Sequence, residues 1–169
     1  MFTVNIALMK RMGHLWKPIF GVVHAPVNRT TWFGGVDLPA TKITDAETSE
    51  ISVKKQKNTQ IRLVASGSHR AERDEKFAKE LGEHELVRMG SSLKACIVAE
   101  GSADLYPRFG PTSCWDIAAA HAVVEAAGGF VLSPQCEPLV YDLVDEVLNP
   151  CFLVTCSSKW NDIWAQNQD

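Results

Sequence analysis

The segment WDIAAAHAVVEAAGG, residues 115–129, constrains the fold more than any other part of the chain. It predicts a helix over residues 115–127, because a long apolar run without strand-like alternation ends in a Gly-Gly pair, which favours a left-handed stop. Six of its residues are alanines, whose small side chains allow neighbouring layers to approach the helix closely. We therefore expect a central helix in a layered structure.

Three side chains on this helix are polar. Winding the segment at about 100° per residue places Glu125 at about 180° and His121 at about 140° from Asp116. His121 and Glu125 then form a narrow stripe, and His121 is predicted to be a surface histidine. Asp116 points the other way, among apolar neighbours, where an unpaired carboxylate is costly. It either caps the first turn of the helix or binds a metal ion in a cleft.

The remaining elements alternate from residue 61 onward, which predicts a layered α/β domain. Strands are expected at 2–9, 18–27, 30–33, 61–66, 84–90, 104–109, 130–133, 138–142 and 152–156, and helices at 71–82, 91–101 and 157–166. Residues 36–59 form a polar connecting segment with a short strand near Ile51–Val53. We divide the chain into residues 1–59, an antiparallel meander with its connecting segment, and residues 60–169, the α/β domain.

Composition excludes several classes of partner. The chain has 169 residues, 46% of them apolar, and a net charge of −3, which argues against nucleic acid or a membrane surface as partner. The five cysteines form no CxxC pair, so reduced thiols in a cytoplasmic protein are the simplest interpretation. The first residues match neither a signal peptide nor a membrane anchor.

Two serine-containing turns are candidate ligand sites. Ser91, Ser92 and Lys94 follow Gly90 at the start of a predicted helix, where backbone amides, hydroxyls and an amine can hold a phosphate. The alternative is a serine cap with a solvated lysine. The Ser66–His69 segment ends a predicted strand, so Ser68 and His69 belong either to a ligand-binding loop or to an ordinary turn.

Arg108 lies in the segment YPRFGP, where it can clamp an anion or pair with a nearby acid. Like the two turns, it falls at the end of a predicted element, where sites in layered α/β proteins draw their residues. One acid that can hold a metal, together with lysine, arginine and histidine, favours an anionic, phosphorylated ligand.

These motifs resemble a known family. WDIAAAHAVVEAAGG is similar to the C-terminal signature of the inositol monophosphatase superfamily, and SGSH, GSSLK, AEGSADLYPRFGPTSCWD and LNPCFLV narrow the resemblance to bacterial 3′(2′),5′-bisphosphate nucleotidases of the CysQ type. The resemblance implies an α-β-α-β-α sandwich and Mg²⁺-dependent removal of a phosphate from adenosine 3′,5′-bisphosphate, a by-product of sulfate assimilation. It makes Asp116 a metal ligand and assigns substrate contacts to Ser68, His69, Gly90, Ser91, Ser92, Lys94, Arg108 and Asp116.

The chain also departs from the family pattern. It has Ser66-Gly67-Ser68-His69 where the family often has Ser-Arg-Ser-His, and it contains no Glu-Glu or Asp-Pro dipeptide. The family places a Glu-Glu pair and an Asp-Pro-x-Asp-Gly-Thr motif, which carry most metal ligands, before the strand that matches FTVNIAL. The resemblance therefore implies a chain truncated at its N-terminus, in which residues 1–59 are the remnant of the family's N-terminal domain.

Truncation of the metal site has consequences for activity. Asp116 alone would hold Mg²⁺ weakly, so we expect a poor phosphatase and no certain catalytic residue in this chain. The alternatives are a catalytically dead nucleotide-binding or structural relic, and an inositol or sugar phosphate phosphatase. The first strand leaves a free sheet edge, which favours a homodimer or pairing with a missing N-terminal fragment.

Overall fold

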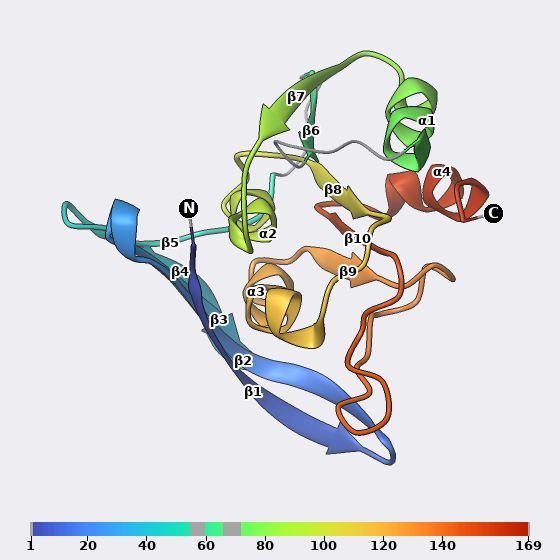
Figure 1. Ribbon diagram of the computed structural model, residues 1–169. Coiled ribbons are helices and arrows are strands. Elements are labelled where there is room, and N and C mark those ends of the chain that lie inside the picture. Colours follow the sequence, from blue (N-terminus) through green and yellow to red (C-terminus); the bar gives the residue numbers. More distant parts are fainter. Residues whose placement is uncertain (1, 55–59, 66–71, 169) are drawn as a thin grey trace.

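The computed structural model describes residues 2–54, 60–65 and 72–168, which form two five-stranded sheets and several helices (Figure 1). The strands are β1 (Val4–Met12), β2 (Leu15–Ala25), β3 (Thr30–Gly35), β4 (Leu38–Ile43), β5 (Thr48–Glu50), β6 (Ile61–Ala65), β7 (His84–Arg88), β8 (Leu105–Arg108), β9 (Phe130–Leu132) and β10 (Phe152–Thr155). The α-helices are α1 (Glu72–Leu81), α2 (Leu93–Ala99), α3 (Cys114–Ala126) and α4 (Asn161–Gln166), and the 3₁₀ turns are η1 (Pro26–Asn28) and η2 (Ser158–Trp160).

The layers follow from the two sheets. β1 to β5 form an antiparallel meander in chain order, as predicted for the first three strands, and the second sheet has the order β7-β6-β8-β10-β9. Helices α2 and α3 lie between the sheets, whereas α1 and α4 lie beyond the second sheet (Figure 1). The predicted layered α/β class is confirmed. The described residues supply four of its five expected layers, without an outer helical layer on the β1–β5 sheet. The division into two domains stays a prediction.

Close packing of α3 on the first sheet depends on small residues on both sides. A methyl group added at Gly21 of β2 would lie 2.0 Å from the carbonyl oxygen of Ala119. One added at Gly34 of β3 would lie 2.9 Å from the Cβ of Ala126. The alanine-rich helix therefore sits directly on the strands, as its sequence predicts.

Three sequence predictions of strands are wrong in detail. β4 lies inside the segment predicted to be a connection, and the short strand that follows is β5 rather than Ile51–Val53. Residues 138–142 form no strand and make only isolated bridges, Leu132–Pro138 and Trp16–Tyr141. Pro138 has no amide hydrogen to donate, which limits a ladder there. The final helix is also split, into η2 and α4.

His121 is buried, so its prediction as a surface histidine is wrong. Its side chain is 0% exposed, and its Nδ1 forms a 2.8 Å hydrogen bond with the hydroxyl of Tyr141. Its Nε2 lies 3.3 Å from Glu125 Oε1, an electrostatic contact without hydrogen-bond alignment, and Glu125 also pairs with Lys17 at 3.2 Å. The segment carrying Tyr141 therefore covers the stripe that the helical wheel assigns to solvent.

Burial of His121 predicts a pH-dependent stability. Burial lowers the pKa of His121, although Glu125 opposes this shift. The unfolded chain therefore binds more protons below about pH 6.5, and stability is lost as the pH falls through that value. We expect the free energy of unfolding to be lower at pH 5.5 than at pH 7.5 through this group. Urea unfolding of His121→Gln should show a shallower pH slope than the wild type, and an unchanged slope would contradict this role of His121.

Two further expectations concern the whole molecule. All five cysteines, at positions 96, 114, 136, 151 and 156, are free thiols. None of the helices within the described ranges combines the length and the apolar character that crossing a bilayer requires.

Candidate functional site

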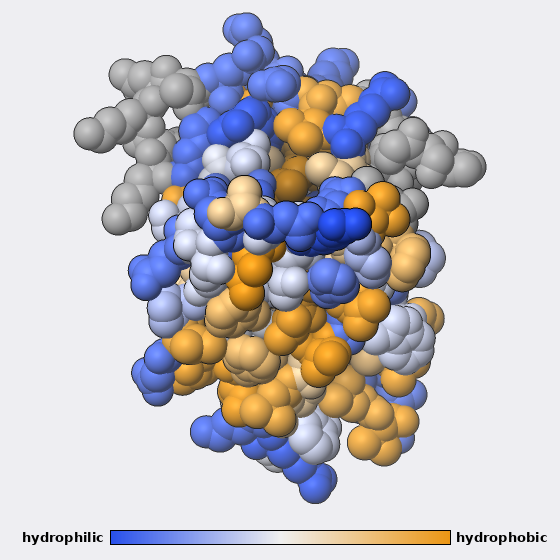
Figure 2. Space-filling view, turned by 90° about the vertical axis from the view of Figure 1, so that its left-hand side faces the viewer, coloured by the Kyte–Doolittle hydropathy of each residue, from blue (hydrophilic) through white to orange (hydrophobic). Residues whose placement is uncertain are grey.

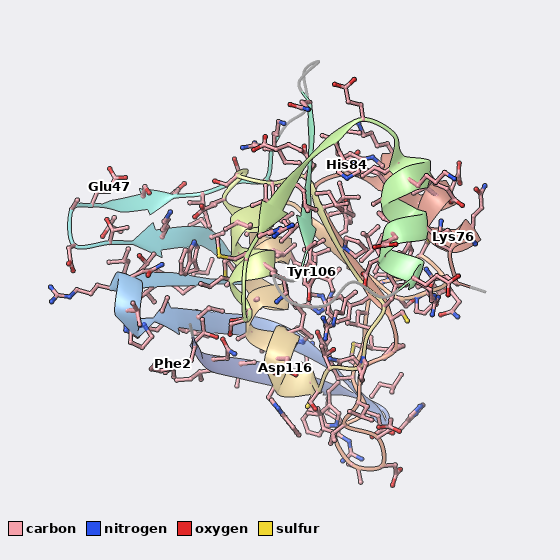
Figure 3. The ribbon with its side chains drawn as sticks, turned by 45° about the horizontal axis from the view of Figure 1, so that its top comes forward. Phe2, Glu47, Lys76, His84, Tyr106 and Asp116 are labelled. Carbon is pink, nitrogen blue, oxygen red and sulfur yellow. The ribbon has the colours of Figure 1, made fainter. Side chains whose placement is uncertain are left out.

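A pocket of about 250 Å³ gathers most of the predicted site residues between the two sheets. It is lined by Asn5, Ser91, Ser92, Lys94, Tyr106, Arg108, Pro111, Thr112, Asp116, Ile117 and Phe152. Figure 3 labels two of the residues that line it, Tyr106 on β8 and Asp116 at the start of α3. Segments far apart in the sequence thus meet at one cavity. Ser68 and His69 lie outside the described residues, and Gly90 directly precedes the Ser91 turn.

The Ser91-Ser92 turn has an unusual backbone. Ser91 adopts a left-handed conformation with φ of 54°, which is uncommon for a residue with a side chain. Its carbonyl accepts a 2.9 Å hydrogen bond from Lys94 Nζ, and its hydroxyl lies 2.7 Å from that of Thr3. Ser92 occupies the N-cap position of α2, but its hydroxyl makes no capping bond. The predicted serine cap is therefore wrong, since the Ser91 and Ser92 hydroxyls bond to Thr3 and Asn5 of the first strand region instead.

Lys94 is a buried cation, not a solvated lysine. The residue is only 8% exposed, and its ammonium lies 5.4 Å from the centre of the Tyr106 ring. Burial, with a further contribution from Arg108, lowers the pKa of Lys94 to about 8, while Asp116 opposes the shift. Near neutral pH the amine is mainly charged. An anion that binds in the pocket would offset the free-energy cost of removing this ammonium from water.

Arg108 uses few of its N–H donors within the protein. Its Nη2 donates to the carbonyl of Pro111 at 3.1 Å, and its guanidinium lies against Gly110. Its buried Nε finds no hydrogen-bond partner within the described part of the chain. A guanidinium has five N–H donors in a planar fork that matches phosphate oxygens. Arg108 therefore has donors to offer a phosphorylated ligand.

Asp116 caps helix α3 at the edge of the pocket. Its Oδ2 accepts a 2.9 Å hydrogen bond from the backbone amide of Ser113, which is the N-cap residue. The capping prediction is confirmed. The expectation that Asp116 is surrounded by apolar groups is wrong, because the residue is exposed at the first turn. One carboxylate can cap the helix through one oxygen and present the other to a cation.

Asn5 is a site residue that the sequence analysis did not identify. Its Oδ1 accepts a 2.9 Å hydrogen bond from the Ser92 hydroxyl, and its Nδ2 donates to the carbonyl of Trp115 at 3.4 Å. It therefore links β1 to the turn before α2 and to the first turn of α3. The only signal was the alternation of polar Thr3 and Asn5 with apolar residues in the first strand.

We expect Asn5→Ala to weaken ligand binding more than folding. Losing the acceptor for the Ser92 hydroxyl should cost about 1 kcal/mol, or roughly fivefold in the dissociation constant of adenosine 3′,5′-bisphosphate. Isothermal titration calorimetry measures this change. The exposed control Asn28→Ala should bind as the wild type does. Equal affinities of Asn5→Ala and the wild type would contradict a role for Asn5 in the pocket.

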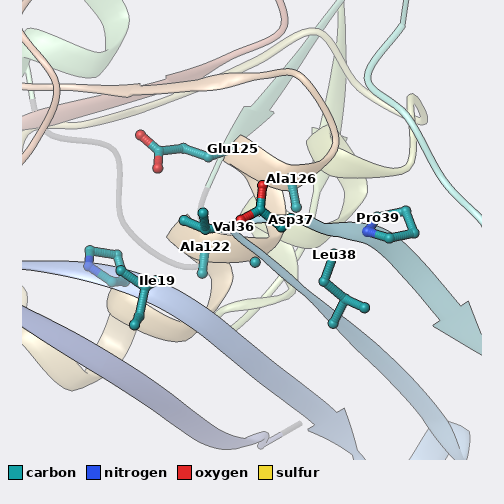
Figure 4. Close-up of a pocket in the computed structure, with 10 residues that line it drawn as sticks. Ile19, Val36, Asp37, Leu38, Pro39, Ala122, Glu125 and Ala126 are labelled. Carbon is teal, nitrogen blue, oxygen red and sulfur yellow. The ribbon is translucent and has the colours of Figure 1, made fainter.

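A larger cavity of about 440 Å³ lies elsewhere, between the β3–β4 hairpin and the C-terminal half of α3 (Figure 4). Its walls include Ile19, Leu38 and Ala122, and its charged groups are the carboxylates of Asp37 and Glu125. Like charges would repel a phosphate there. The smaller pocket, with Lys94 and Arg108, is the better match to an anionic ligand.

Several known proteins are similar to this chain. The chain is 43% identical over 160 residues to the 3′(2′),5′-bisphosphate nucleotidase CysQ of Salmonella typhimurium, covering 91% of this chain and 60% of the relative. It is 44% identical to the CysQ protein of Escherichia coli K12, with the same coverage. The crystal structure of CysQ from Bacteroides thetaiotaomicron superposes with a TM-score of 0.78 at 34% identity, over 92% of this chain and 63% of that one.

The chain thus spans about three fifths of the length of these curated relatives. The inositol monophosphatase of Anabaena, at 24% identity and a TM-score of 0.73, shares the fold over 96% of this chain and 63% of its own. Residues 1–162 match the sequence profile of the inositol monophosphatase family. The predicted resemblance is confirmed, and this chain belongs to the inositol monophosphatase family.

Proposed function

We propose that this chain carries the substrate-binding part of a 3′(2′),5′-bisphosphate nucleotidase and binds adenosine 3′,5′-bisphosphate in the pocket between its sheets. The observation that carries the proposal is that Lys94 and Arg108 line the same cavity, where a phosphorylated ligand could pair with both cations. A nucleoside bisphosphate presents two phosphates, so both cations can be used at once. Its adenosine needs no charged partner.

Asp116 is the proposed Mg²⁺ ligand. Mg²⁺ in phosphate-binding sites is commonly held by one or two carboxylates together with substrate phosphates, and an exposed carboxylate at the pocket edge fits that pattern. When bound, the ion would supply positive charge to the phosphoryl oxygens. Among the described residues, no group of three His, Cys, Asp or Glu side chains is placed to hold a metal. We therefore propose that metal binding depends on the nucleotide.

Turnover by this chain alone is proposed to be weak. The pocket has one carboxylate among its lining residues, and the sequence lacks the Glu-Glu and Asp-Pro dipeptides of the family motifs. The same observation favours a second candidate, a protein that binds the nucleotide without hydrolysing it. We also propose a cytoplasmic location and a role in sulfate assimilation, with a small-molecule partner. The free cysteines and the CysQ relatives support these proposals.

Two measurements on the same samples test the proposal. Adenosine 3′,5′-bisphosphate with Mg²⁺ should raise the thermal unfolding midpoint of the wild type, and Arg108→Ala should lose this shift. Phosphate release should be slow, Mg²⁺-dependent and absent from Asp116→Ala. No stabilisation at millimolar nucleotide would overturn the binding role. Stabilisation without any phosphate release would leave the second candidate.

A further inference from the structure

Arg73, in the first turn of α1, contacts three other segments of the chain. Its guanidinium carbon lies 4.8 Å from the centre of the Phe109 ring. Its Nη1 donates a hydrogen bond to the sulfur of Cys151 at 3.7 Å, and its Nη2 donates one to the carbonyl of Asn167, the C-cap residue of α4, at 2.8 Å. We call these three contacts the Arg73 anchor. The anchor joins α1 to the residue after β8, the residue before β10 and the end of α4.

Two of the anchored residues are direct neighbours of residues that line the pocket. Phe109 directly follows Arg108 in the chain, and Cys151 directly precedes Phe152. Arg108 and Phe152 are in register at the end of the antiparallel β8–β10 pair, and both line the pocket of about 250 Å³. A hydrogen bond from the Cys151 thiol to the Phe109 carbonyl, at 3.5 Å, connects the anchored residues to each other. The anchor therefore holds the two strands where they carry side chains of the pocket.

The Arg73 anchor lies on the outer side of the second sheet. The centre of the Phe109 ring lies 5.9 Å from that of Phe77 on α1 and 5.2 Å from that of Trp164 on α4. Both helices lie beyond the second sheet (Figure 1), on the side of the molecule opposite the β1–β5 sheet, whose apolar residues Figure 2 shows. Arg73 is not among the residues that line the pocket, so it would act on a ligand through the strands rather than by contact.

We propose that Arg73 is a positioning residue, which holds the end of the β8–β10 pair and thereby sets the direction of the Arg108 guanidinium toward an anion. This inference rests on the proposed function of the pocket. The hydrogen bond that Arg108 itself donates goes to Pro111, three residues further along the same segment. Such a local bond orients the side chain within its segment but does not fix the segment on the sheet. A guanidinium that is already ordered binds an anion more tightly, because less conformational freedom is lost on binding.

Hydrogen exchange of the free protein, followed by mass spectrometry, tests the anchor without any nucleotide. Arg73→Met removes the guanidinium and keeps a long side chain, and the fold should survive because Arg73 is only partly buried. Backbone amides within residues 105–112 should exchange about fivefold faster, because the strand end opens more often, and those of α3 should not change. A second variant, Arg73→Gln, should behave in the same way. Arg62→Met is the matched control, because Arg62 donates a 2.9 Å hydrogen bond to the Gly101 carbonyl near the opposite end of β8.

Isothermal titration calorimetry with adenosine 3′,5′-bisphosphate tests the consequence for the pocket. Arg73→Met should bind the nucleotide about fivefold more weakly, because the loosened segment must be ordered on binding. Arg62→Met, which also removes one positive charge, should bind as the wild type does. In the Arg108→Ala background, titrated at millimolar nucleotide, Arg73→Met should cause no further loss, because the residue that it positions is absent. A general effect of charge near the pocket would instead weaken both backgrounds equally.

The outcomes separate the anchor from the positioning role and from the proposed function. Unchanged exchange over residues 105–112 in Arg73→Met and Arg73→Gln would overturn the anchor. Faster exchange with wild-type affinity, or equal losses of affinity with and without Arg108, would overturn the positioning role. A wild type that binds no nucleotide would overturn the proposed function and the positioning role with it. Faster exchange together with a loss of affinity that depends on Arg108 would support the proposal.

Discussion

Replacing Lys94 with methionine is expected to weaken the binding of adenosine 3′,5′-bisphosphate about 30- to 100-fold. The change keeps a long unbranched side chain and removes a buried ammonium, which the structure places in the pocket beside Arg108 and Asp116. A hydrogen-bonded charge that is shielded from water contributes about 2–3 kcal/mol to binding an anion. Isothermal titration calorimetry at pH 7 measures the loss. Lys76→Met, which removes an exposed lysine from α1, is the matched control and should bind normally.

The pH dependence of binding separates the charge of Lys94 from its shape. Its pKa of about 8 means that affinity should fall as the pH rises through that value, since the neutral amine no longer attracts phosphate. Lys94→Arg should keep its affinity at pH 9, because a guanidinium stays protonated. Stability of the free chain should change in the opposite direction. A lysine whose folded pKa lies below 10.5 is protonated more readily when unfolded, so stability rises between about pH 8 and 10.5. Equal binding at pH 7 and pH 9 would contradict the role of Lys94.

Much of the fold could be predicted from the sequence because the local residue pattern of many segments matches the element that they form in the structure. The alanine-rich segment has helical composition and forms α3, and the run IRLVA has strand composition and forms β6. β4 could not be predicted in this way. Its residues LPATKI alternate poorly, with two exposed and then two buried positions, so periodicity does not distinguish the strand from a loop.

His121 illustrates a different limit. The helical wheel correctly places it on one stripe with Glu125, but a wheel shows only which residues share a face. Whether that face meets solvent depends on the segment around Tyr141, which follows α3 by more than ten residues. Sequence patterns on one element therefore predict its amphipathicity better than its burial.

The candidate site shows the same division. That Lys94, Arg108 and Asp116 line one pocket was expected from the short sequence motifs that carry them, while their roles toward a ligand stay predictions. Asn5 could not be predicted, since its role arises from a strand of the other sheet that reaches the turn before α2. A residue that acts by joining two distant segments leaves little trace in either segment alone.

Replacing Gly21 with alanine is expected to destabilise the chain by about 3 kcal/mol or more, the largest change in stability that we predict. A strand interior normally gains up to about 1 kcal/mol from alanine in place of glycine, because the unfolded chain loses freedom. Here the new methyl group would lie 2.0 Å from the Ala119 carbonyl oxygen and 2.7 Å from the attached carbon. Both atoms belong to the backbone of α3, so no side-chain rotation relieves the contact, and helix and sheet must separate.

Urea unfolding followed by circular dichroism measures this loss against two further glycine variants. Gly90→Ala places its methyl group in open space, and its unfolding free energy should stay within about 0.5 kcal/mol of the wild type. Gly34→Ala should fall between the two, because its nearest contact is the Cβ of Ala126 at 2.9 Å. If Gly21→Ala were as stable as Gly90→Ala, α3 would not rest directly on β2, and the close approach that places Asp116 beside β1 and the Ser91 turn would need another cause.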